Sequence, residues 1–510
     1  MNPRRSFVRK IVYLAAIAIL LVPLFWLSQP TTRGSKAGQG SPGGQLAQLR
    51  AKYGLTETQL GDIDPTSETI ELATFGMRGI AANLLWQKSN LYKMKKDWTN
   101  LSATLEQLSK LEPHFVGVWQ FQAWNLSYNV SAEFDDYRER FRWVIKGLKF
   151  LDEGISFNKR EPRLLSYSGW ITSHKIGRAD EAKQFRQLYK DPDNVYDIHG
   201  TRPVEQRDNW LVGKEQFEKA EKLVDSGAPL RGTSPVVFHS YVAMCQMNYA
   251  DAIEQDGIFA EKARRAWNRA EHDWNTFGAR EIPTSVGESI RLNEGEMLQE
   301  QVAKLSNEID AFEPGLREKI AQEKRDALTD DMRKALETPA DKRTDEQHRL
   351  AYDAGEKLRV TPEEVAKRVQ GTKRREALKL AKQAADDAKK AEMIDRYRQI
   401  VNFTYWRRRA QIEQTDEATK AREFIYLGNQ AYKSADLGKA KDQYDEGFKK
   451  WRSLLDKPEF ASLKTDRSMV EDLGEVIKKY REILEKRDEG LPKDFILQDI
   501  ANEAAKLQQN

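Results

Sequence analysis

Cysteine is nearly absent from this sequence, in which Cys245 is the single thiol among 510 residues. One cysteine excludes an intramolecular disulfide and a metal centre built on cysteine pairs, so no covalent cross-link supports the fold. We expect Cys245 to be a buried or half-buried apolar residue. Net charge is small as well, because 83 Lys and Arg residues and 79 Asp and Glu residues sum to +4. This balance argues against binding to nucleic acid through overall positive charge.

Proline is also scarce, with 17 residues, and runs of Val, Ile or Thr are few. Ala, Leu, Glu, Lys, Gln and Arg are abundant instead, and these residues favour helices over strands. The hydrophobic fraction of 39% suffices for several cores, whereas a charged fraction of 32% is too high for one large globule. The composition therefore predicts an all-α protein with more than one unit.

The longest apolar run lies near the N-terminus, where residues 11–27 carry no charge. As a helix this run would extend about 25 Å, close to the thickness of the hydrocarbon layer. Basic residues within 1–10 precede it, which indicates a cytoplasmic N-terminus. A cleaved signal peptide is the alternative, although the run ends at bulky rather than small residues. The sequence thus predicts a single-pass anchor in the lipid bilayer of the plasma (inner) membrane, with most of the chain in the periplasm.

A triplet of a small, an aromatic and a small residue occurs twice with identical spacing, as Ala440-Tyr444-Gly447 and as Ala263-Trp267-Ala270. Glycine weakens a helix interior by about 1 kcal/mol relative to alanine, so its presence needs a compensating contact. Small residues let two helix backbones approach closely while the aromatic ring fills the groove between them. We therefore expect both triplets at contacts between paired helices.

Turn residues divide much of the chain into helical hairpins. The expected units are a hairpin over 84–113, a second over 119–162, a third over 164–185 with a turn at 177–182, a half-unit over 210–220, and further units over 241–270 and 424–447.

The last of these units carries a family resemblance. Phe424, Leu427, Gly428, Ala440 and Tyr444 follow the order aromatic, Leu-Gly, Ala, aromatic, and this order resembles the tetratricopeptide repeat family. The chain is also similar to bacterial membrane-anchored proteins of this repeat type. The resemblance implies an α-solenoid of helical hairpins. The expected organisation is a cytoplasmic N-terminus (1–10), a transmembrane anchor (11–27), a flexible linker (28–45), a repeat domain (46–295), a charged hairpin or coiled coil (296–398) and a C-terminal repeat domain (399–510).

The resemblance implies a concave groove, lined by the first helix of each hairpin, that holds a protein or peptide partner. The candidate groove residues, which lie off the packing stripe at helical spacing, are Trp86, Asn90, Lys93, Trp124, Tyr128, Asn429, Tyr432 and Lys433. On this interpretation the protein is a non-catalytic scaffold without a cofactor. The family's clamp for C-terminal carboxylates would place asparagine at Asn90, but Trp86 replaces the lysine one turn earlier.

The charged region 296–398 predicts a helical insertion, either a hairpin or a short coiled coil, that is a candidate contact for homo-oligomers. Its basic residues are interpreted as a solvated face rather than as a surface for nucleic acid or lipid headgroups. They are Lys373, Arg374, Arg375, Lys379, Lys382, Lys389 and Lys390, and Arg407, Arg408 and Arg409 follow just beyond the region.

The six histidines fall in no metal-binding spacing, and the sequence has no nucleophile elbow and no phosphate-binding glycine loop. Catalytic residues need not be close in sequence, so an enzyme remains the alternative hypothesis. The alternative is an α-helical, hydrolase-like enzyme of the cell envelope with a site near His174, His199 and His239, together with Arg202 and Arg207.

Overall fold

The computed structural model describes residues 78–507 and, before them, the isolated positions 15, 19, 23, 26, 44, 45 and 48. Apart from these positions, the expected N-terminus, anchor and linker (1–10, 11–27 and 28–45) lie outside the described residues. Contacts divide the chain into two compact units, Met1–Gly232 (unit 1) and Thr233–Asn510 (unit 2). This division falls inside the range 46–295 that the sequence analysis treats as one repeat domain.

The predicted location in the plasma membrane is overturned, because no helix of the described residues is both long and apolar enough to cross a bilayer. The longest helix discussed below, α19 (Arg374–Ile400), shows the physical reason. It has 27 residues, but Lys, Arg, Glu and Asp recur along its whole length. Charged side chains at this density are too costly to place in hydrocarbon.

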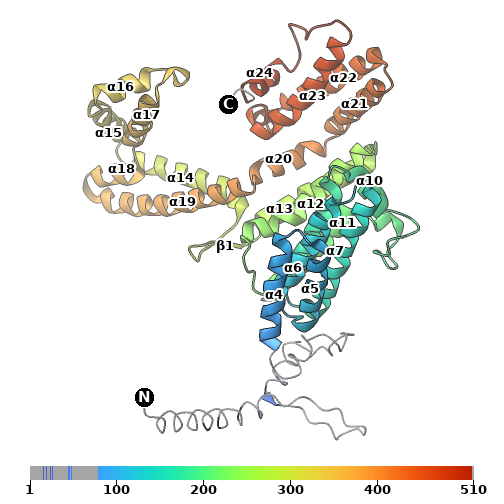
Figure 1. Cartoon of the computed structure of the whole chain (residues 1–510). Helices are drawn as coiled ribbons and strands as arrows, with labels where there is room; N and C mark the ends of the chain where they lie inside the picture. Colours follow the sequence, from blue (N-terminus) through green and yellow to red (C-terminus); the bar gives the residue numbers. More distant parts are fainter. Residues whose placement is uncertain are drawn as a thin grey trace. The chain divides into compact units, whose positions relative to one another are not determined.

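The described residues are predominantly helical (Figure 1), which confirms the all-α class. The sheet content of residues 78–507 is one antiparallel pair, β1 (Ile282–Pro283) and β2 (Ser289–Ile290), in which Ile282 is opposite Ile290. The sequence analysis missed this short pair. Cys245 is fully buried, as expected.

Unit 1 consists of helices of very different length joined by turns and loops. They are α4 (Arg78–Met94), α5 (Trp98–Leu111), α6 (Val116–Trp124), η1 (Asn125–Val130), α7 (Tyr137–Phe157), α8 (Pro162–Trp170), η2 (Ile171–Lys175), α9 (Ile176–Arg178), α10 (Ala182–Tyr189), η3 (Val204–Gln206) and α11 (Asn209–Asp225). Both η1 and η2 are π-helical and continue the α-helix before them. Aspartate side chains accept hydrogen bonds from backbone N–H groups at the starts of α5, α7 and α11, and these caps set where the helices begin.

Helices of unit 1 pack in pairs: α4 along α5, α6 and η1 along α7, and α8 and η2 along α11. Glycine makes two of these contacts possible. A Cβ atom on Gly147 of α7 would lie 2.8 Å from the carbonyl oxygen of Ala123, and one on Gly213 of α11 would lie 3.0 Å from that of Gly169. The third predicted hairpin, 164–185, is therefore corrected. The main partner of α8 and η2 is α11, and the eight-residue α10 packs on α7 and α9 instead.

Unit 2 contains the remaining helices. They are α12 (Pro235–Gln255), α13 (Ala260–Ala279), η4 (Leu292–Glu294), α14 (Gly295–Asp310), α15 (Leu316–Asp326), α16 (Asp330–Glu337), η5 (Ala340–Lys342), α17 (Asp345–Leu358), α18 (Pro362–Arg368), η6 (Gly371–Lys373), α19, α20 (Phe403–Glu413), α21 (Asp416–Lys433), α22 (Leu437–Leu455), η7 (Ala461–Thr465), α23 (Arg467–Glu485) and α24 (Gln498–Leu507).

Both small–aromatic–small triplets lie at helix contacts of unit 2, as the spacing predicts. Their side chains are buried on α13 and on α22. At the pair of α21 and α22, a Cβ atom on Gly428 would lie 2.8 Å from a ring carbon of Tyr444, and one on Gly447 would lie 3.2 Å from the carbonyl oxygen of Ala421. The ring of Tyr444 thus fills the space that the missing side chain of Gly428 leaves.

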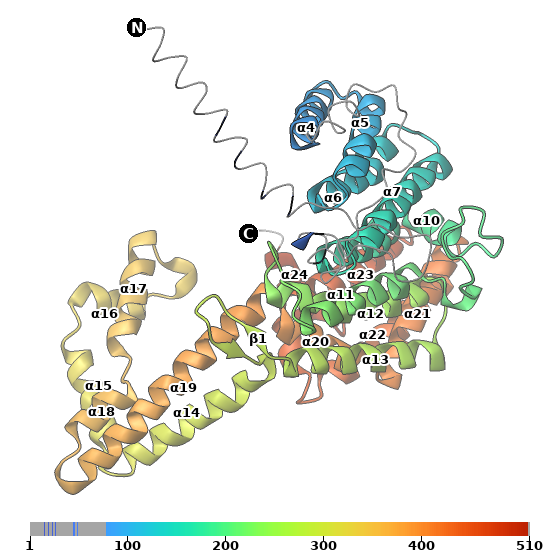
Figure 2. The same cartoon turned by 90° about the horizontal axis from the view of Figure 1, so that it is seen from below.

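Region 296–398 forms a helical insertion, as predicted. Its long helices α14 and α19 lie side by side in both views (Figures 1 and 2), and four shorter helices, α15 to α18, follow at their far end. Alanines of α19 are buried between the two long helices. Of the seven basic residues listed for this region, all are exposed except Lys390, whose Nζ lies 3.0 Å from a carboxylate oxygen of Glu294.

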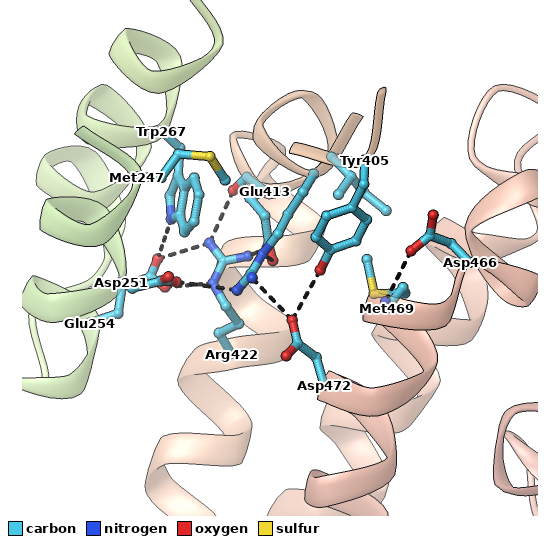
Figure 3. A network of polar contacts seen from close by, with 12 residues as sticks. Met247, Asp251, Glu254, Trp267, Tyr405, Glu413, Arg422, Asp466, Met469 and Asp472 are labelled. Carbon is cyan, nitrogen blue, oxygen red and sulfur yellow. Dashed lines mark hydrogen bonds and ion pairs between the residues drawn. The ribbon is translucent and has the colours of Figure 1, made fainter. Parts of the chain in front are cut away.

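A buried ionic network joins α12, α20, α21 and α23 of unit 2 (Figure 3). Arg422 donates to both carboxylate oxygens of Glu254 at 2.6 and 2.8 Å and also pairs with Glu413. Arg409 pairs with Asp472 at 3.0 Å and with Asp251 at 3.4 Å. The interpretation of Arg409 as part of a solvated face is therefore wrong, because its side chain is only 16% exposed.

Candidate functional site

Six half-buried rings on neighbouring helices of unit 1 form the most distinctive feature of the described residues, and we call them the aromatic row. They are Trp86 on α4, Phe121 and Trp124 on α6, Tyr128 on η1, Trp170 on α8 and His174 on η2. All six lie on the first helices of the three pairs. Half-buried aromatic rings combine a fixed position with surface that a partner can cover.

Successive members of the row are joined by ring contacts or, between Tyr128 and Trp170, by a hydrogen bond. The ring centroids of Trp86 and Phe121 are 6.2 Å apart, those of Phe121 and Trp124 are 6.1 Å apart, and those of Trp124 and Tyr128 are 6.3 Å apart. A side-chain hydrogen bond joins Tyr128 to Trp170. The imidazole of His174 is stacked on Trp170 with centroids 3.7 Å apart. The row is therefore continuous from α4 to η2.

Residues of the row on the second helix pair recur 46 positions later on the third helix pair. Trp124 corresponds to Trp170, Ser127 to Ser173 and Tyr128 to His174. In both copies the α-helix changes to a π-helix directly after the tryptophan. A π-helical turn contains an extra residue and changes the direction of the side chains that follow, and such turns are frequent at functional sites. The sequence analysis missed this repeat, which a comparison of the chain with itself at this offset would have found.

Basic side chains lie over rings of the row and next to it. Lys93 Nζ is 4.9 Å from the ring centroid of Phe121, and Lys175 Nζ is 4.8 Å from that of Tyr128. Arg178 lies 5.9 Å above the ring of Trp210, which is itself in edge contact with His174. These cation–π contacts place cations along the row and next to it.

Burial changes the protonation equilibria of the row. It lowers the pKa of His174 to about 4, with a further lowering by the charge of Arg178, so the imidazole is neutral at pH 7. Burial also raises the pKa of Tyr128, against the opposing effect of the hydrogen bond with Trp170. The neutral His174 accounts for its close stacking on Trp170, because no charge has to be desolvated there.

Four of the predicted groove residues belong to this surface. Trp86, Trp124 and Tyr128 are members of the row, and Lys93 lies over it. Asn90 is exposed on α4, one turn from Trp86. Helical spacing within single repeats did not predict Phe121 and Trp170 as members of this surface.

The other predicted groove residues lie on α21 of unit 2, and two of them serve internal contacts. Asn429 is half-buried and accepts a hydrogen bond of 2.9 Å from the hydroxyl group of the buried Tyr444, and its role in a groove stays a prediction. Tyr432 is hydrogen-bonded to Lys486 Nζ, which also lies 4.6 Å from the centroid of its ring. Lys433 is exposed.

The residues of the alternative enzyme site are held in separate contacts. His199 is bonded to the carbonyl oxygen of Tyr189, and Arg202 makes two hydrogen bonds of 2.7 Å to Glu215. Arg207 donates to backbone carbonyl groups, at 2.9 Å to that of Arg202 and at 2.7 Å to that of Asp191. His239 belongs to unit 2. These contacts explain His199, Arg202 and Arg207 as stabilisers of the loop before α11, and an enzyme site that includes the histidines stays a prediction.

Within the part of the chain that the structure describes, no group of three or more His, Cys, Asp or Glu side chains is placed to hold a metal ion. No family model and no curated protein matches the chain. The similarity to tetratricopeptide repeats therefore remains a hypothesis.

Proposed function

We propose that this protein is a non-catalytic helical scaffold whose unit 1 binds a protein or peptide partner across the aromatic row. We further propose that the helix pairs are tetratricopeptide-like repeats of an α-solenoid. In such a solenoid the first helices of successive hairpins line one continuous surface, which suits an extended partner.

The observation that carries the proposal is the continuity of half-buried rings over three helix pairs. Aromatic residues in the core of unit 1 differ from the row in their exposure to water. Trp119 is completely buried and donates its indole N–H to the carbonyl oxygen of Pro113 at 2.8 Å. The rings of the row keep part of their surface in water instead. Tryptophan and tyrosine are among the residues that most often dominate the binding energy of protein interfaces.

The proposal is tested by selecting ligands for the full-length protein from a displayed library of random peptides. A selected peptide is then titrated into the wild type, a Tyr128→Ala variant and a Tyr137→Ala variant. Tyr137 is the matched control, because it is also half-buried in unit 1 with a cation, Arg138, over its ring, but it lies on α7 outside the row. We expect Tyr128→Ala to weaken binding about tenfold or more and Tyr137→Ala to leave it within about twofold. Equal effects of the two substitutions, or the absence of selected peptides, contradict the proposal.

We propose self-association through region 296–398 as a second role, because large apolar side chains are exposed there. Met297 is 59% exposed and Tyr352 is 72% exposed. Light scattering should show a multiple of the monomer mass for the wild type and a smaller mass for a Met297→Lys/Tyr352→Lys variant. A monomeric wild type, or an unchanged mass in the variant, rules this role out.

A further inference from the structure

We propose that unit 1 has a second binding site, separate from the aromatic row, for a small organic ammonium compound with an apolar tail. The site is a pocket of about 420 Å³ between α5, η1 and α7, and we call it the α5–α7 pocket. Its volume is within the range of small-molecule sites in proteins. None of the residues that line it belongs to the aromatic row, so this inference is independent of the proposed function.

Aromatic rings dominate the wall of the pocket. Trp98, Phe134, Trp143 and Phe150 line it together with the apolar side chains of Leu126 and Val130. The rings of Phe134 and Trp143 are stacked with centroids 5.8 Å apart. The electron-rich faces of such rings attract quaternary and other alkylated ammonium groups, which lose little hydration on entering an apolar site.

Two carboxylates lie in the lining, from Glu106 and Glu133, against one ammonium group, that of Lys146. The carboxylate of Glu133, which is an exposed residue, accepts a hydrogen bond of 2.9 Å from the indole N–H of Trp98. The excess of negative charge at an aromatic wall favours a cationic ligand over an anionic one.

Lys146 shows that this wall accepts a cation. Its Nζ lies 4.2 Å from the ring centroid of Trp143. The lysine side chain is exposed and anchored only through its stem on α7, so a ligand cation can displace it from the ring. Lys146 is thus a competitor of the ligand rather than its partner.

The test uses calorimetric titration of the full-length protein with three compounds of similar length: hexyltrimethylammonium, 1-heptanol and heptanoate. We expect the ammonium compound to bind about tenfold more tightly than the alcohol and the carboxylate. Binding of heptanol as tight as that of the ammonium compound would mean a purely apolar pocket and would overturn the proposal. Tighter binding of heptanoate, or no binding of any compound, would overturn it as well.

Two substitutions of opposite effect locate the site. Glu133→Gln removes the charge but keeps an acceptor for Trp98, and we expect it to weaken hexyltrimethylammonium binding about fivefold or more. Lys146→Met removes the competing cation, and we expect it to strengthen binding severalfold. Glu153→Gln and Lys149→Met, which are exposed on the same helix outside the pocket, should leave the affinity unchanged. Weaker binding by Lys146→Met would show that the lysine is a ligand partner and refute the assignment.

Discussion

Gly147 lies where α7 passes closest to α6 and η1. A methyl group there would meet the backbone carbonyl oxygen of Ala123 at 2.8 Å and the Oγ atom of Ser127 at a still shorter distance. Because a carbonyl oxygen cannot turn away, we expect Gly147→Ala to lower the free energy of unfolding by about 1–3 kcal/mol, although alanine is the better helix former. Urea denaturation followed by circular dichroism measures this change.

Gly79 provides the control for this substitution. It is also in a helix of unit 1, but an added Cβ atom would meet nothing within 4 Å. Gly79→Ala should therefore leave the stability unchanged or raise it by up to about 1 kcal/mol. If the two substitutions had equal effects, close backbone approach would not be the reason for glycine at position 147.

His174 makes the stability of unit 1 depend on pH. Its pKa is about 4 in the folded chain and 6.5 in a model compound, so between these values the unfolded chain binds more protons. The free energy of unfolding therefore falls as the pH drops from 6.5 to 4, and the loss is complete below pH 4. We expect the wild type to lose about 1–3 kcal/mol more than a His174→Phe variant over this interval.

The free energy of unfolding of both proteins is measured by denaturation at pH 7 and pH 4.5. Subtracting the change in the variant from the change in the wild type cancels the contribution of the other titrating groups, which the two proteins share. Phenylalanine preserves the ring stacked on Trp170 but cannot take up a proton. Parallel pH profiles for the two proteins would show that His174 is not held neutral by burial.

At the scale of elements, the ionic network of unit 2 holds α12, α20 and α21 together. Arg422 is the shared partner of Glu254 and Glu413, whose side chains are only 6% and 4% exposed. Removing it leaves two buried carboxylates without this cation. We therefore expect Arg422→Met to cost about 3–5 kcal/mol of stability.

Arg265→Met is the control for the network. Arg265 pairs with Glu261 at 2.7 Å on α13, but its side chain is 77% exposed. A solvated pair of this kind contributes little, so the control should cost less than about 0.5 kcal/mol. A cost for Arg422→Met as small as that of the control would show that water already reaches the network.

The sequence predicted elements whose signals are local and missed those that depend on distant residues. The spacing of Ala440, Tyr444 and Gly447 lies within one helix, and their burial was predicted correctly. Arg409 pairs with Asp251, which is 158 residues away in the chain, and no local pattern distinguishes it from a solvated arginine. The pairing of α8 with α11 was not predicted for a similar reason. The turn at 177–182 is a local signal, and it indicated the shorter α10 as the partner of α8.

The candidate site was predicted in part. Helical spacing placed Trp86, Trp124 and Tyr128 off the packing stripe, and the structure brings these three into one row. The same rule did not predict that Asn429 accepts a hydrogen bond from the hydroxyl group of Tyr444 across the hairpin of α21 and α22. Helical spacing predicts on which face of a helix a residue lies, but it does not predict which side chain of another helix covers that face.

At the scale of the whole molecule, the division into two units predicts where the folded chain is cut by a protease. Residues 226–234 connect α11 of unit 1 to α12 of unit 2, and Gly227 and Gly232 adopt positive φ angles there. Arg231 and the three residues after it are exposed, so this part of the segment can enter the extended conformation that a protease requires. Within residues 78–507 we therefore expect brief trypsin treatment to cut first after Arg231, although exposed Lys and Arg residues are numerous on the helices.

Mass spectrometry identifies the first cut, and an Arg231→Gln variant provides the control, because it removes this trypsin site without changing either unit. The two products should retain their helical circular dichroism, since each unit has its own buried core. A first cut inside α12 or α21, or the loss of helical signal in both products, would show that the two units fold only as one.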